Sequence, residues 1–578
     1  MAETHSYKMF GLFTRKFEVK EAHPSLDVVE AFADCTNRQT HMNAAQLRRF
    51  LVEYQAGEGC SDVDATRILN EIRHRRNLEG DQDLCLEDFF YFLLFADDLN
   101  GPIKKEVHHD MTAPLQHYFI YTGHNSYLTG NQLSSDCSDE PIIKALQRGV
   151  KVIELDLWPN SDEDDIDVLH GRTLTTPVPL IKCLKSINEH AFAKSQYPVI
   201  ITLEDHLTAD LQAKVAKMVI EVFGEKLYYP DNEHIDEFPS PEELKGKIIL
   251  STKPPKEYLK AKQSKDNKGK ASKSGKDSSE DEIPEDSDGD QGDEDSDNDV
   301  SSGQPAHSGV PEYKRLIAIR AGKPKNGLIE ALKSGLEKIR RLSLSETALQ
   351  TAAEDHGPDL VRFTQRNFLR IYPKGTRITS SNYKPLIGWM HGAQMVAFNM
   401  QGYGKSLWIM HGMFRGNGGC GYLKKPDFLM WRGPNDKIFD PGAPSEVKKN
   451  LKVRVYMGDG WRMDFSKTHF DSHSPPDFYV KLSIMGVPAD YAKKKTKVID
   501  DDWVPHWDEE FTFPLTVPEL ALLRVLVKEY NRSEKDDFAG QTCLPVSEIR
   551  PGFRSVPLYD KKGEKLPSVR LLMKFQFV

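Results

Sequence analysis

The sequence is poor in cysteine and lacks a long apolar run. Its seven cysteines in 578 residues are odd in number and scattered, which excludes a disulfide-dense secreted scaffold and a paired-cysteine zinc site. We therefore expect reduced thiols in the cytoplasm. The most apolar block, residues 89–96, is too short to cross a bilayer, and the opening MAETHSYKMF has no apolar core of a signal peptide. Any membrane contact is expected to be peripheral.

The chain also lacks a large charge of one sign outside a single segment. Of the net charge of −10, residues 260–299 carry −7, from seven lysines against fourteen carboxylates, and the rest carries only −3. That balance argues against nucleic acid as a partner. Residues 256–310 contain almost no apolar side chains and are predicted to form a disordered charged linker, because they cannot bury enough surface to offset the entropy of ordering.

What is present divides into several domains, as 578 residues require. Residues 20–105 have apolar side chains at helical spacing in VVEAF, LRRFLVEY and FFYFLLF, which predicts a lobe of paired helix-loop-helix units. Calcium binding by its loops is not expected. Asp34, Thr36 and Arg38 lack the necessary charge, and Gln82 stands where a competent loop needs glycine.

Short strands alternate with helical stretches in residues 110–255, and the pattern resumes in residues 311–432. The strand candidates include HYFIYTG, KVIELDLW, IDVLHG, PVIITLED and KIILSTK, then FLRIYP and AQMVAFNM. This alternation predicts a parallel sheet with covering helices, interrupted by the charged linker. Residues 448–578 change to strands without helices, which predicts an all-β sandwich.

Polar residues that can take part in catalysis or bind a metal lie at the ends of these strands. Glu154 and Asp156 in KVIELDLW point to one side of the strand, because side chains alternate faces. Glu204 ends PVIITLE, the pair His124 and Asn125 follows HYFIYTG, and His170 follows DVL. The carboxyl ends of parallel strands are where an α/β barrel assembles its active site.

Two like-charged carboxylates on one face call for a cation. Three carboxylates and an amide oxygen favour calcium or magnesium over zinc. Two histidines are then left for proton transfer or charge stabilisation, which together with a cation suits the cleavage of a phosphodiester. Each signal alone is weak, since a histidine beside a strand is more often structural, but they occur together at successive strand ends.

These residues also carry a resemblance. HNSYLTGNQLSSDCS, GVKVIELDLW, LHGRTLTTPVPL, YPVIITLEDHL and LKGKIILSTK resemble the X half of the catalytic TIM-type barrel of phosphoinositide-specific phospholipase C. RIYPKGTRITSSNYKPLIGWMHGAQMVAFNMQ and FRGNGGCGYLKKP resemble its Y half. With an EF-hand-like lobe before the barrel and a C2-type sandwich after it, the chain looks like a short, plant-type member without a pleckstrin-homology domain.

The resemblance implies hydrolysis of phosphatidylinositol 4,5-bisphosphate and related phosphoinositides to diacylglycerol and a soluble inositol phosphate. The inositol 2-hydroxyl attacks phosphorus, and water then opens a cyclic phosphodiester. Carried over by motif, His124 stabilises the phosphorane and His170 protonates the leaving oxygen. Asn125, Glu154, Asp156 and Glu204 hold Ca²⁺, and Glu154 or Glu204 doubles as base.

The resemblance assigns the headgroup phosphates to Lys253, Arg370, Tyr372 and a serine of SLSE, either Ser343 or Ser345. Arginine suits bidentate contact with phosphate. There is one departure from the family pattern. Many relatives have a K-x-K arrangement where this chain reads Ser251, Thr252, Lys253, which bears on preference for the bisphosphate over monophosphates.

In the sandwich, four residues resemble the loop ligands through which C2 domains bind calcium and lipid: Asp477, Asn531, Asp536 and Asp537. The partner expected is a membrane that contains phosphoinositides and anionic lipids, at the cytoplasmic side of the plasma membrane, and the chain is expected to act as a monomer. Asn531 stands where a carboxylate is frequent, so the ligand charge is reduced.

Three interpretations remain open on the residues alone. The chain can be an active phospholipase, an inactive relative that serves as a phosphoinositide-binding scaffold, or a barrel enzyme for soluble glycerophosphodiesters. The presence of both histidines and all the ligands speaks against the scaffold. The C2-type sandwich and the Y-half phosphate residues speak against soluble substrates. Fold alone does not decide, because barrels host many chemistries.

Overall fold

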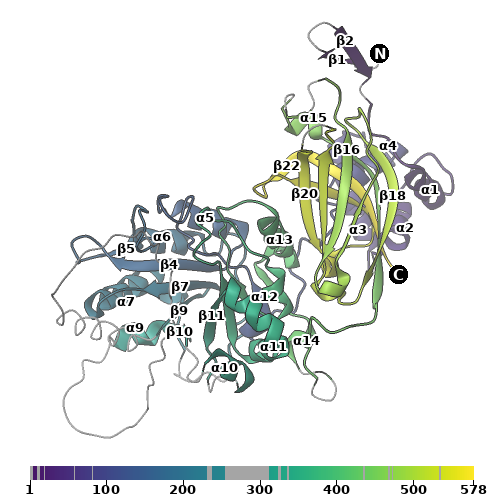
Figure 1. The fold of residues 1–578 in the computed structure, drawn as a ribbon. Coiled ribbons are helices and arrows are strands. Elements are labelled where there is room, and N and C mark those ends of the chain that lie inside the picture. Colours follow the sequence, from purple (N-terminus) through teal and green to yellow (C-terminus); the bar gives the residue numbers. More distant parts are fainter. Residues whose placement is uncertain are drawn as a thin grey trace, which may run out of the picture. The chain divides into compact units, whose positions relative to one another are not determined.

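The computed structural model divides the chain into two compact units, each described here by itself (Figure 1). One comprises Met1–His108, Tyr403–Gly418 and Pro441–Val578, and the other His109–Gly402 and Gly419–Asp440. The residues that the structure describes are 4–9, 13–18, 20–57, 59–80, 82–230, 237–253, 311–322, 327–334, 338–431, 433, 437–466, 469–470, 473–532 and 535–578. The linker 256–310 lies outside them.

The first unit begins with an antiparallel hairpin and a helical lobe. The hairpin pairs β1 (Thr4–Met9) with β2 (Phe13–Glu18). The helices are α1 (Leu26–Cys35), α2 (Ala44–Glu53), α3 (Asp62–Arg76) and α4 (Leu86–Phe95). Met42 and Leu84 exchange backbone hydrogen bonds of 2.8 and 3.1 Å, which join the α1–α2 loop to the α3–α4 loop. The helical lobe is thereby confirmed as two linked helix-loop-helix units.

Local sequence fixes where these helices begin. The Asn43 side chain accepts a hydrogen bond from the Gln46 N–H (3.0 Å), and the Gln46 side chain accepts one from the Asn43 N–H (2.9 Å). Ser61 and Asp64 form the same reciprocal pair at the start of α3. Such capping boxes satisfy backbone donors that the first turn leaves without partners.

The lobe shares a core with the sandwich of the same unit. Phe50 packs edge-on against Phe89, with ring centroids 4.7 Å apart, and lies 6.3 Å from Phe553 of the sandwich. Tyr456 and Leu572 of the sandwich belong to the same buried cluster. Neither part can expose this apolar surface without cost, so the lobe and the sandwich form one folded body.

A buried hydrogen-bond network, here called the polar joint, fixes how the lobe packs on the sandwich. Gln55, only 2% exposed, donates from Nε2 to the Asn100 side chain (2.8 Å) and the Phe553 carbonyl (2.7 Å), and its Oε1 accepts from the Phe553 N–H (2.6 Å). Arg554 donates to Asn100 Oδ1 (3.1 Å) and to the Gln55 carbonyl (2.9 Å). These polar groups are paired with one another, as buried polar groups must be.

The sandwich contains two layers of antiparallel strands. One layer has the order β17 (Ala492–Lys495), β16 (Phe478–Met485), β19 (Leu522–Glu529), β20 (Asp537–Pro545). The other has the order β21 (Gly552–Tyr559), β22 (Lys565–Phe577), β15 (Lys449–Asp459), β18 (His506–Leu515). Gln541 and Tyr559 are the pair that connects them. The expected all-β sandwich is confirmed.

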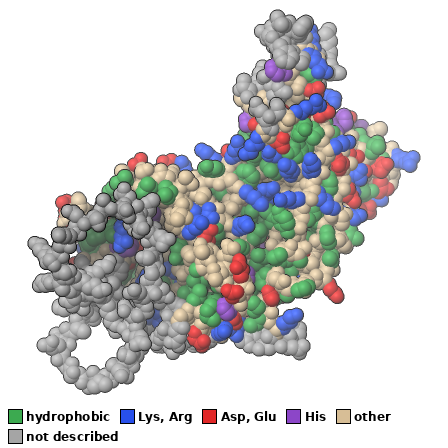
Figure 2. Space-filling view, in the orientation of Figure 1, with side chains coloured by type: hydrophobic (Ala, Val, Ile, Leu, Met, Phe, Trp, Pro, Cys, Tyr) green, Lys and Arg blue, Asp and Glu red, His purple; other side chains and the backbone are tan. Residues whose placement is uncertain are grey.

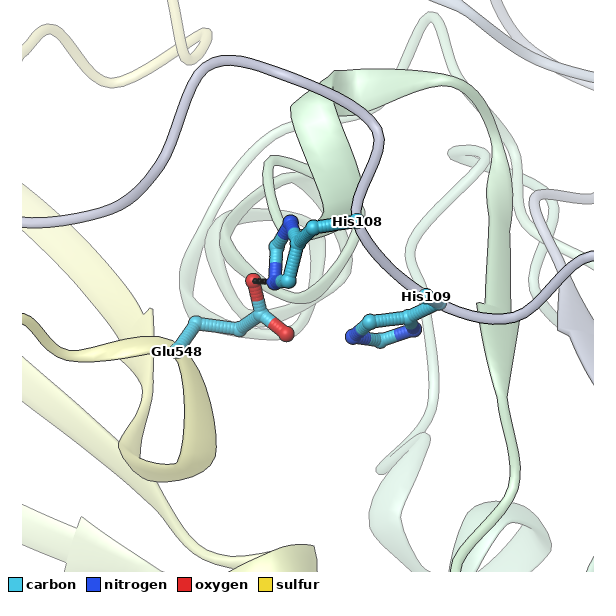
Figure 3. Close-up of side chains that lie close together, drawn as sticks. All are labelled: His108, His109 and Glu548. Atoms are coloured by element: carbon cyan, nitrogen blue, oxygen red, sulfur yellow. Dashed lines mark ion pairs between the residues drawn. The ribbon is translucent and has the colours of Figure 1, made fainter. Parts of the chain in front are cut away.

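Residues 403–418 pack with the sandwich. Helix α13 (Lys405–Met413) lies so close to β20 that a Cβ on Gly412 would stand 2.3 Å from Cys543 Cβ, which explains the glycine. His108 Nε2 lies 3.2 Å from a carboxylate oxygen of Glu548 in this unit (Figure 3). Glu548 also accepts from the Asn417 N–H (3.1 Å). These contacts hold the segment to the sandwich.

The second unit is a parallel barrel. Its strands follow one another around a closed ring: β3 (Tyr118–Ile120), β4 (Val152–Pro159), β7 (Val199–Asp205), β9 (Ile248–Thr252), β10 (Ile317–Arg320), β11 (Arg341–Ser345), β12 (Phe368–Tyr372) and β13 (Met395–Val396). Parallel bridges from Thr122 to Val152 and from Ala321 to Arg341 connect the two sheets, and β13 pairs with β3. The TIM-type barrel is confirmed.

Helices cover the outside of the barrel (Figure 1). They are α5 (Glu140–Arg148), α6 (Leu180–His190), α7 (Ala209–Phe223), α9 (Pro311–Leu316), α10 (Leu328–Ser334), α11 (Glu346–Arg366), α12 (Leu386–Met390) and α14 (Asp427–Met430). Smaller strands at its edges are β5 (Ile166–Val168), β6 (Val178–Pro179), β8 (Leu227–Tyr228) and β14 (Tyr422–Lys424). No helix in the described residues is both long and apolar enough to span a membrane.

Replacing Gln55 by alanine should destabilise the first unit. The change leaves the Phe553 N–H and carbonyl buried without their partners, which costs about 2–4 kcal/mol. Thermal unfolding of the full chain is expected to begin at a lower temperature. The exposed Gln39 is the matched control, and Gln39→Ala should change the midpoint little. Equal midpoints for the two variants would mean that the joint adds nothing to stability.

Candidate active site

Acidic side chains from neighbouring strands meet at the carboxyl end of the barrel. Strands β4 and β7 run parallel, with Glu154 opposite Thr202 and Asp156 opposite Glu204. Glu154 and Asp156 are 1% and 3% exposed, although each carries a carboxylate. Because alternate residues of a strand share a face, the three carboxylates lie on one side of the β4–β7 pair.

Glu154 is compensated by an arginine from the opposite part of the barrel. Its Oε1 forms a short ion pair with Arg370 Nη2, and its Oε2 accepts a 3.0 Å hydrogen bond from the Asn125 N–H. Burial opposes ionisation of Glu154, but Arg370, His124 and the Asn125 N–H outweigh it, so the pKa of Glu154 is lowered. Glu154 is therefore ionised at neutral pH.

Asp156 forms no ion pair with any described residue, although the charge of Arg370 acts on it from a distance. One of its oxygens accepts a 2.7 Å hydrogen bond from the Tyr127 hydroxyl, while the buried Oδ1 has no hydrogen-bond partner in the described structure. Burial raises the pKa of Asp156 well above its usual value, and the charges of Glu204 and Glu154 raise it further. Ionisation of Asp156 thus needs additional positive charge.

Glu204 faces solvent at the rim of the barrel. The surrounding protein atoms still reduce its hydration, and this effect, followed by the charge of Glu154, raises its pKa. The same two causes act on Asp156, so these carboxylates repel one another in the absence of a cation.

The oxygen atoms at this end fit a hard cation such as calcium. Asp156 Oδ1 is buried and has no hydrogen-bond partner in the described structure, and burial, followed by neighbouring carboxylates, raises the pKa of both Asp156 and Glu204. Asn125 has a left-handed backbone (φ 42°), and its Nδ2 donates to Gln132 Oε1 (2.9 Å), a bond that uses the nitrogen of the amide and not its oxygen. Three carboxylates and one amide oxygen form a ligand set that calcium prefers.

His124 is held in one orientation at the same end. Its Nδ1 lies 2.9 Å from Asn399 Oδ1, so the ring donates from Nδ1 and its Nε2 remains for a ligand. Burial lowers the pKa of His124 to about 4, although Glu154 acts in the opposite direction. The ring is neutral at pH 7 when no anion is bound beside it.

His170 reaches this end by a route that differs from the sequence expectation. We expected it to follow a parallel strand of the barrel, but β5 pairs antiparallel with β4, so that expectation is wrong. Strand β4 is long enough to extend past the barrel, and β5 folds back along the extension. The Leu169 N–H then donates to the Asp156 carbonyl (3.3 Å), which brings His170 back toward the carboxylates.

Gln132 connects the parts of the site, and sequence reasoning missed it. Its Nε2 donates to Asn399 Oδ1 (3.1 Å) and to Ser380 Oγ (2.8 Å), and its Oε1 accepts from Asn125. The Gln132 carbonyl lies 2.6 Å from His170 Nδ1. One residue in a loop therefore positions both histidines and Asn125. Asn399, also missed, lies inside the strand candidate AQMVAFNM, whereas the observed strand β13 ends at Val396, so the candidate was too long to reveal a polar residue beyond the strand.

The residues assigned to headgroup phosphates surround the same barrel end. Ser343 lies opposite Arg370 and Ser345 opposite Tyr372 in the parallel pair β11–β12. The Arg370 guanidinium stands over the Tyr372 ring at 5.7 Å, and Lys253 is exposed just beyond β9. Ser345 caps helix α11, because its Oγ accepts from the Ala348 N–H (3.2 Å). Ser343 is therefore the serine that is not used as a helix cap, and it is the better candidate for a phosphate contact.

Arg341 is a further cation inside the barrel that sequence reasoning missed. It is 6% exposed, and its Nη1 donates to Thr202 Oγ1 (3.1 Å) and Ser251 Oγ (3.0 Å). The signal for it was present, since Arg341 shares the face of β11 with Ser343.

The residues predicted from C2 loops lie in the other unit. Tyr530 N–H donates to the Asp477 carbonyl (2.7 Å), so the two loops are neighbours. Asp536 accepts from the Tyr479 hydroxyl and, at 3.4 Å, from the Asn531 N–H. Asn531 Nδ2 donates to Asp537 Oδ2 (3.1 Å). The structure therefore gathers Asn531, Asp536 and Asp537 beside the loop of Asp477.

Three family models match the chain. Residues 111–254 match the X domain of phosphatidylinositol-specific phospholipase C, and residues 322–428 match its Y domain. Residues 449–560 match the C2 domain. The X and Y matches cover the strands that carry the barrel-end residues.

Curated relatives match over nearly the whole length. Phosphoinositide phospholipase C 6 of Arabidopsis thaliana is 60% identical over 99% of this chain and 97% of that protein. Phosphoinositide phospholipase C 4 of the same organism is 57% identical over 100% and 99%. The human 1-phosphatidylinositol 4,5-bisphosphate phosphodiesterase delta-1 is 31% identical over 95% of this chain and 71% of its own length.

Solved structures with this fold include the crystal structure of S. officinalis PLC21. It superposes with a TM-score of 0.72 and 26% identity over 96% of this chain and 68% of that one. L. pealei PLC21 gives a TM-score of 0.71, also at 26% identity.

Removing Arg370 should show how much the stability of the barrel depends on the ion pair with Glu154. Arg370→Leu leaves Glu154 without its cation, and breaking a buried ion pair costs about 3–5 kcal/mol. In calcium-free buffer the barrel should unfold at a lower temperature than in the control Arg366→Leu, which alters an exposed arginine. Glu154→Gln added to Arg370→Leu should recover part of the loss. Equal midpoints for Arg370→Leu and Arg366→Leu would contradict this role.

Proposed function

Because the chain belongs to the phosphoinositide-specific phospholipase C family and so hydrolyses phosphoinositides, we propose that it cleaves phosphatidylinositol 4,5-bisphosphate, with Ca²⁺ as cofactor. The observation that carries the proposal is the group of Asn125, Glu154, Asp156 and Glu204 at the barrel end, where Asp156 Oδ1 is buried without a hydrogen-bond partner in the described structure and where hydrogen bonds orient two histidines. The products are diacylglycerol and inositol trisphosphate, which serve intracellular signalling.

The chain's own residues account for the proton transfers. The inositol 2-hydroxyl loses its proton to a carboxylate and attacks phosphorus, and the bond from phosphorus to the diacylglycerol oxygen breaks. Both Glu154 oxygens are already engaged by Arg370 and Asn125, so Glu204 is the better placed base. His170, oriented through Nδ1 by the Gln132 carbonyl, gives a proton to the leaving oxygen. Water then opens the cyclic phosphodiester.

His124 stabilises negative charge on the phosphoryl oxygens. Asn399 orients its ring and leaves Nε2 for the substrate. An anionic phosphate beside the ring opposes the effect of burial on its pKa, so the bound complex favours a protonated His124. Ca²⁺ held by Asn125, Glu154, Asp156 and Glu204 would supply further positive charge to the same oxygens.

The remaining polar residues at the barrel end suit the ring phosphates. We propose that Lys253, Arg370, Tyr372 and Ser343 contact them, with Ser345 mainly capping its helix. A catalytically inactive phosphoinositide-binding scaffold is the alternative function. The hydrogen bonds that position both histidines argue against it, since a scaffold has no need of oriented proton-transfer groups.

The sandwich is proposed to dock the enzyme on anionic lipid at the plasma membrane, with the chain acting as a cytoplasmic monomer. Asp477, Asn531, Asp536 and Asp537 are proposed as calcium ligands at its loops. A separate cationic face supports the same role. Lys481 lies opposite Lys495, and Ser483 lies opposite both Lys493 and Arg524. Figure 2 shows lysine and arginine side chains on the sandwich in this view.

The cations of that face have no ion-pair partners among the described residues. In the described part of the chain none of Lys481, Lys493, Lys495 and Arg524 takes part in an ion pair. Lys481 and Lys495 both stand over the Tyr479 ring, at 5.2 and 5.8 Å. Uncompensated cations on one sheet face attract an anionic surface, and the attraction weakens with salt.

Activity should depend on calcium and on both histidines. Release of inositol phosphate from mixed lipid vesicles is measured while calcium is titrated. His170→Ala is expected to lose about 100- to 10,000-fold in rate, the range for a general acid, and His124→Ala should lose a similar factor. His190→Ala, outside the barrel end on α6, serves as control. Activity at full rate in a calcium chelator, or in either histidine variant, would refute the assignment.

Membrane binding should respond to the cationic face. Lys481→Glu with Lys495→Glu should weaken binding of the full chain to vesicles rich in phosphatidylserine, with the difference shrinking as salt increases. Lys494→Glu is the matched control, because Lys494 points to the opposite face of β17 and donates to the Thr512 carbonyl (2.8 Å). Sedimentation with vesicles reports binding. Equal loss in the control would mean that net charge, and not this face, matters.

Calcium dependence of vesicle binding tests the loops separately. Asp477→Asn with Asp536→Asn removes two negative charges from the proposed ligands. The variant should sediment with anionic vesicles equally with and without calcium. If the unaltered chain already binds vesicles equally in both conditions, the loops do not dock the enzyme through calcium.

A further inference from the structure

Arg341 occupies an unusual position in the barrel. It begins β11, yet its guanidinium reaches across the interior to Thr202 on β7 and Ser251 on β9. Thr202 lies opposite both Glu154 and Ser251 in the sheet register. Along their strands, Thr202 and Ser251 precede Glu204 and Lys253 by two residues. The guanidinium therefore lies one layer below the barrel end that carries the carboxylates and Lys253.

Arg341 forms no ion pair within the described residues, although the charges of Glu154 and Glu204 favour its charged form. Its two hydrogen-bond acceptors are neutral hydroxyls, and its Nε is buried without a hydrogen-bond partner in the described structure. Burial lowers the pKa of Arg341 to about 10, with the charge of Arg370 acting in the same direction. The side chain still carries its charge at neutral pH, and a buried charge normally requires a partner of opposite sign.

The contact with Ser251 indicates what the charge of Arg341 is for. The segment Ser251, Thr252, Lys253 supplies one lysine, where the K-x-K pattern of the family that the sequence resembles has two. Arg341 Nη1 is 3.0 Å from Ser251 Oγ, so a positive charge is present at that place although the strand itself does not supply it. The charge comes from β11 and not from β9.

We propose that Arg341 is a phosphate-binding residue that replaces the missing lysine and sets preference for inositol headgroups with ring phosphates. This role rests on the proposed function and assigns the cation set Arg341, Lys253 and Arg370 to the headgroup. The guanidinium of Arg341 has several N–H donors in one plane. Its two hydrogen bonds to the protein both come from Nη1. Nη2 has no hydrogen-bond partner among the described residues and, unlike Nε, is not fully buried, so we assign it to an anion that enters from the mouth of the barrel.

The test compares three lipids and one soluble probe. Arg341→Met keeps a long, uncharged side chain, and Arg340→Met is the matched control at the preceding residue, which points to the other side of the strand. Hydrolysis of phosphatidylinositol, its 4-phosphate and its 4,5-bisphosphate is measured in otherwise identical vesicles. Binding of inositol 1,4,5-trisphosphate to the calcium-free full chain is measured by calorimetry.

Arg341→Met should lose about 10- to 100-fold in kcat/KM on the bisphosphate, mainly through KM, and a similar factor in trisphosphate affinity, the range for a charge-assisted hydrogen bond. Hydrolysis of phosphatidylinositol should change less than about 2-fold. Adding Ser251→Lys to Arg341→Met should restore preference for the bisphosphate, because it returns the charge from β9. Arg340→Met should retain the preference of the unaltered chain.

Two results would overturn the role of Arg341. Equal losses on all three lipids would mean that it only supports the fold or the carboxylates, and retained preference in Arg341→Met would mean that the phosphates do not contact it. An unaltered chain that shows no preference for phosphorylated headgroups would overturn the proposed substrate as well. The failure of the broader proposal is thereby distinguished from the failure of this one.

Discussion

Carboxylates that are buried side by side repel one another, and the rest of the barrel end is arranged around that constraint. Glu154 is ionised because Arg370 and the Asn125 N–H compensate it. Asp156 and Glu204 form no ion pair with any described residue, and burial and neighbouring negative charge raise their pKa values. A cation bound among these carboxylates reduces their repulsion. The affinity of the site for the cation comes from their negative charge. The ion-free site therefore favours a cation.

The positive charges follow the same logic. Arg370 balances Glu154, while Arg341 lies deeper with only hydroxyl partners. An anionic headgroup that enters this end meets cations that the protein has not fully neutralised. Calcium on one side and phosphate on the other therefore complete the charge balance of a barrel whose strands fix the geometry. Hydrogen bonds through Gln132 keep the two histidines oriented while ligands come and go.

The fold was predictable where sequence patterns are long. Glu154 and Asp156 stand in an extended apolar strand, and the family motifs span both halves of the barrel, so the architecture and most candidate residues could be named. Short strands were not: β10 and β11 are brief, and none of the strand candidates covers them. The direction of β5 was missed because alternation of apolar residues does not distinguish parallel from antiparallel pairing.

Residues that act through another side chain were the hardest to predict. Gln132 lies in a loop, and its importance comes from contacts with Asn399 and Ser380, more than 240 positions away in sequence. In the sequence Arg341 is one of two adjacent arginines in IRRLSLS, and only the closed barrel brings it to Ser251. The choice between Ser343 and Ser345 likewise required the helix cap to be seen. The local sequence shows the type of each of these residues and, for those in strands, the face that each occupies, but not the partner that it meets in the folded barrel.

The account is tested most directly by calorimetric titration of Ca²⁺ into the full chain with Asp477→Asn and Asp536→Asn, which removes the proposed loop sites. The barrel carboxylates should still bind one calcium ion, and adding Asp156→Asn should weaken that binding strongly. Calcium binding that is absent from the first variant, or that is unchanged by Asp156→Asn, would contradict the claim that these carboxylates form the cation site.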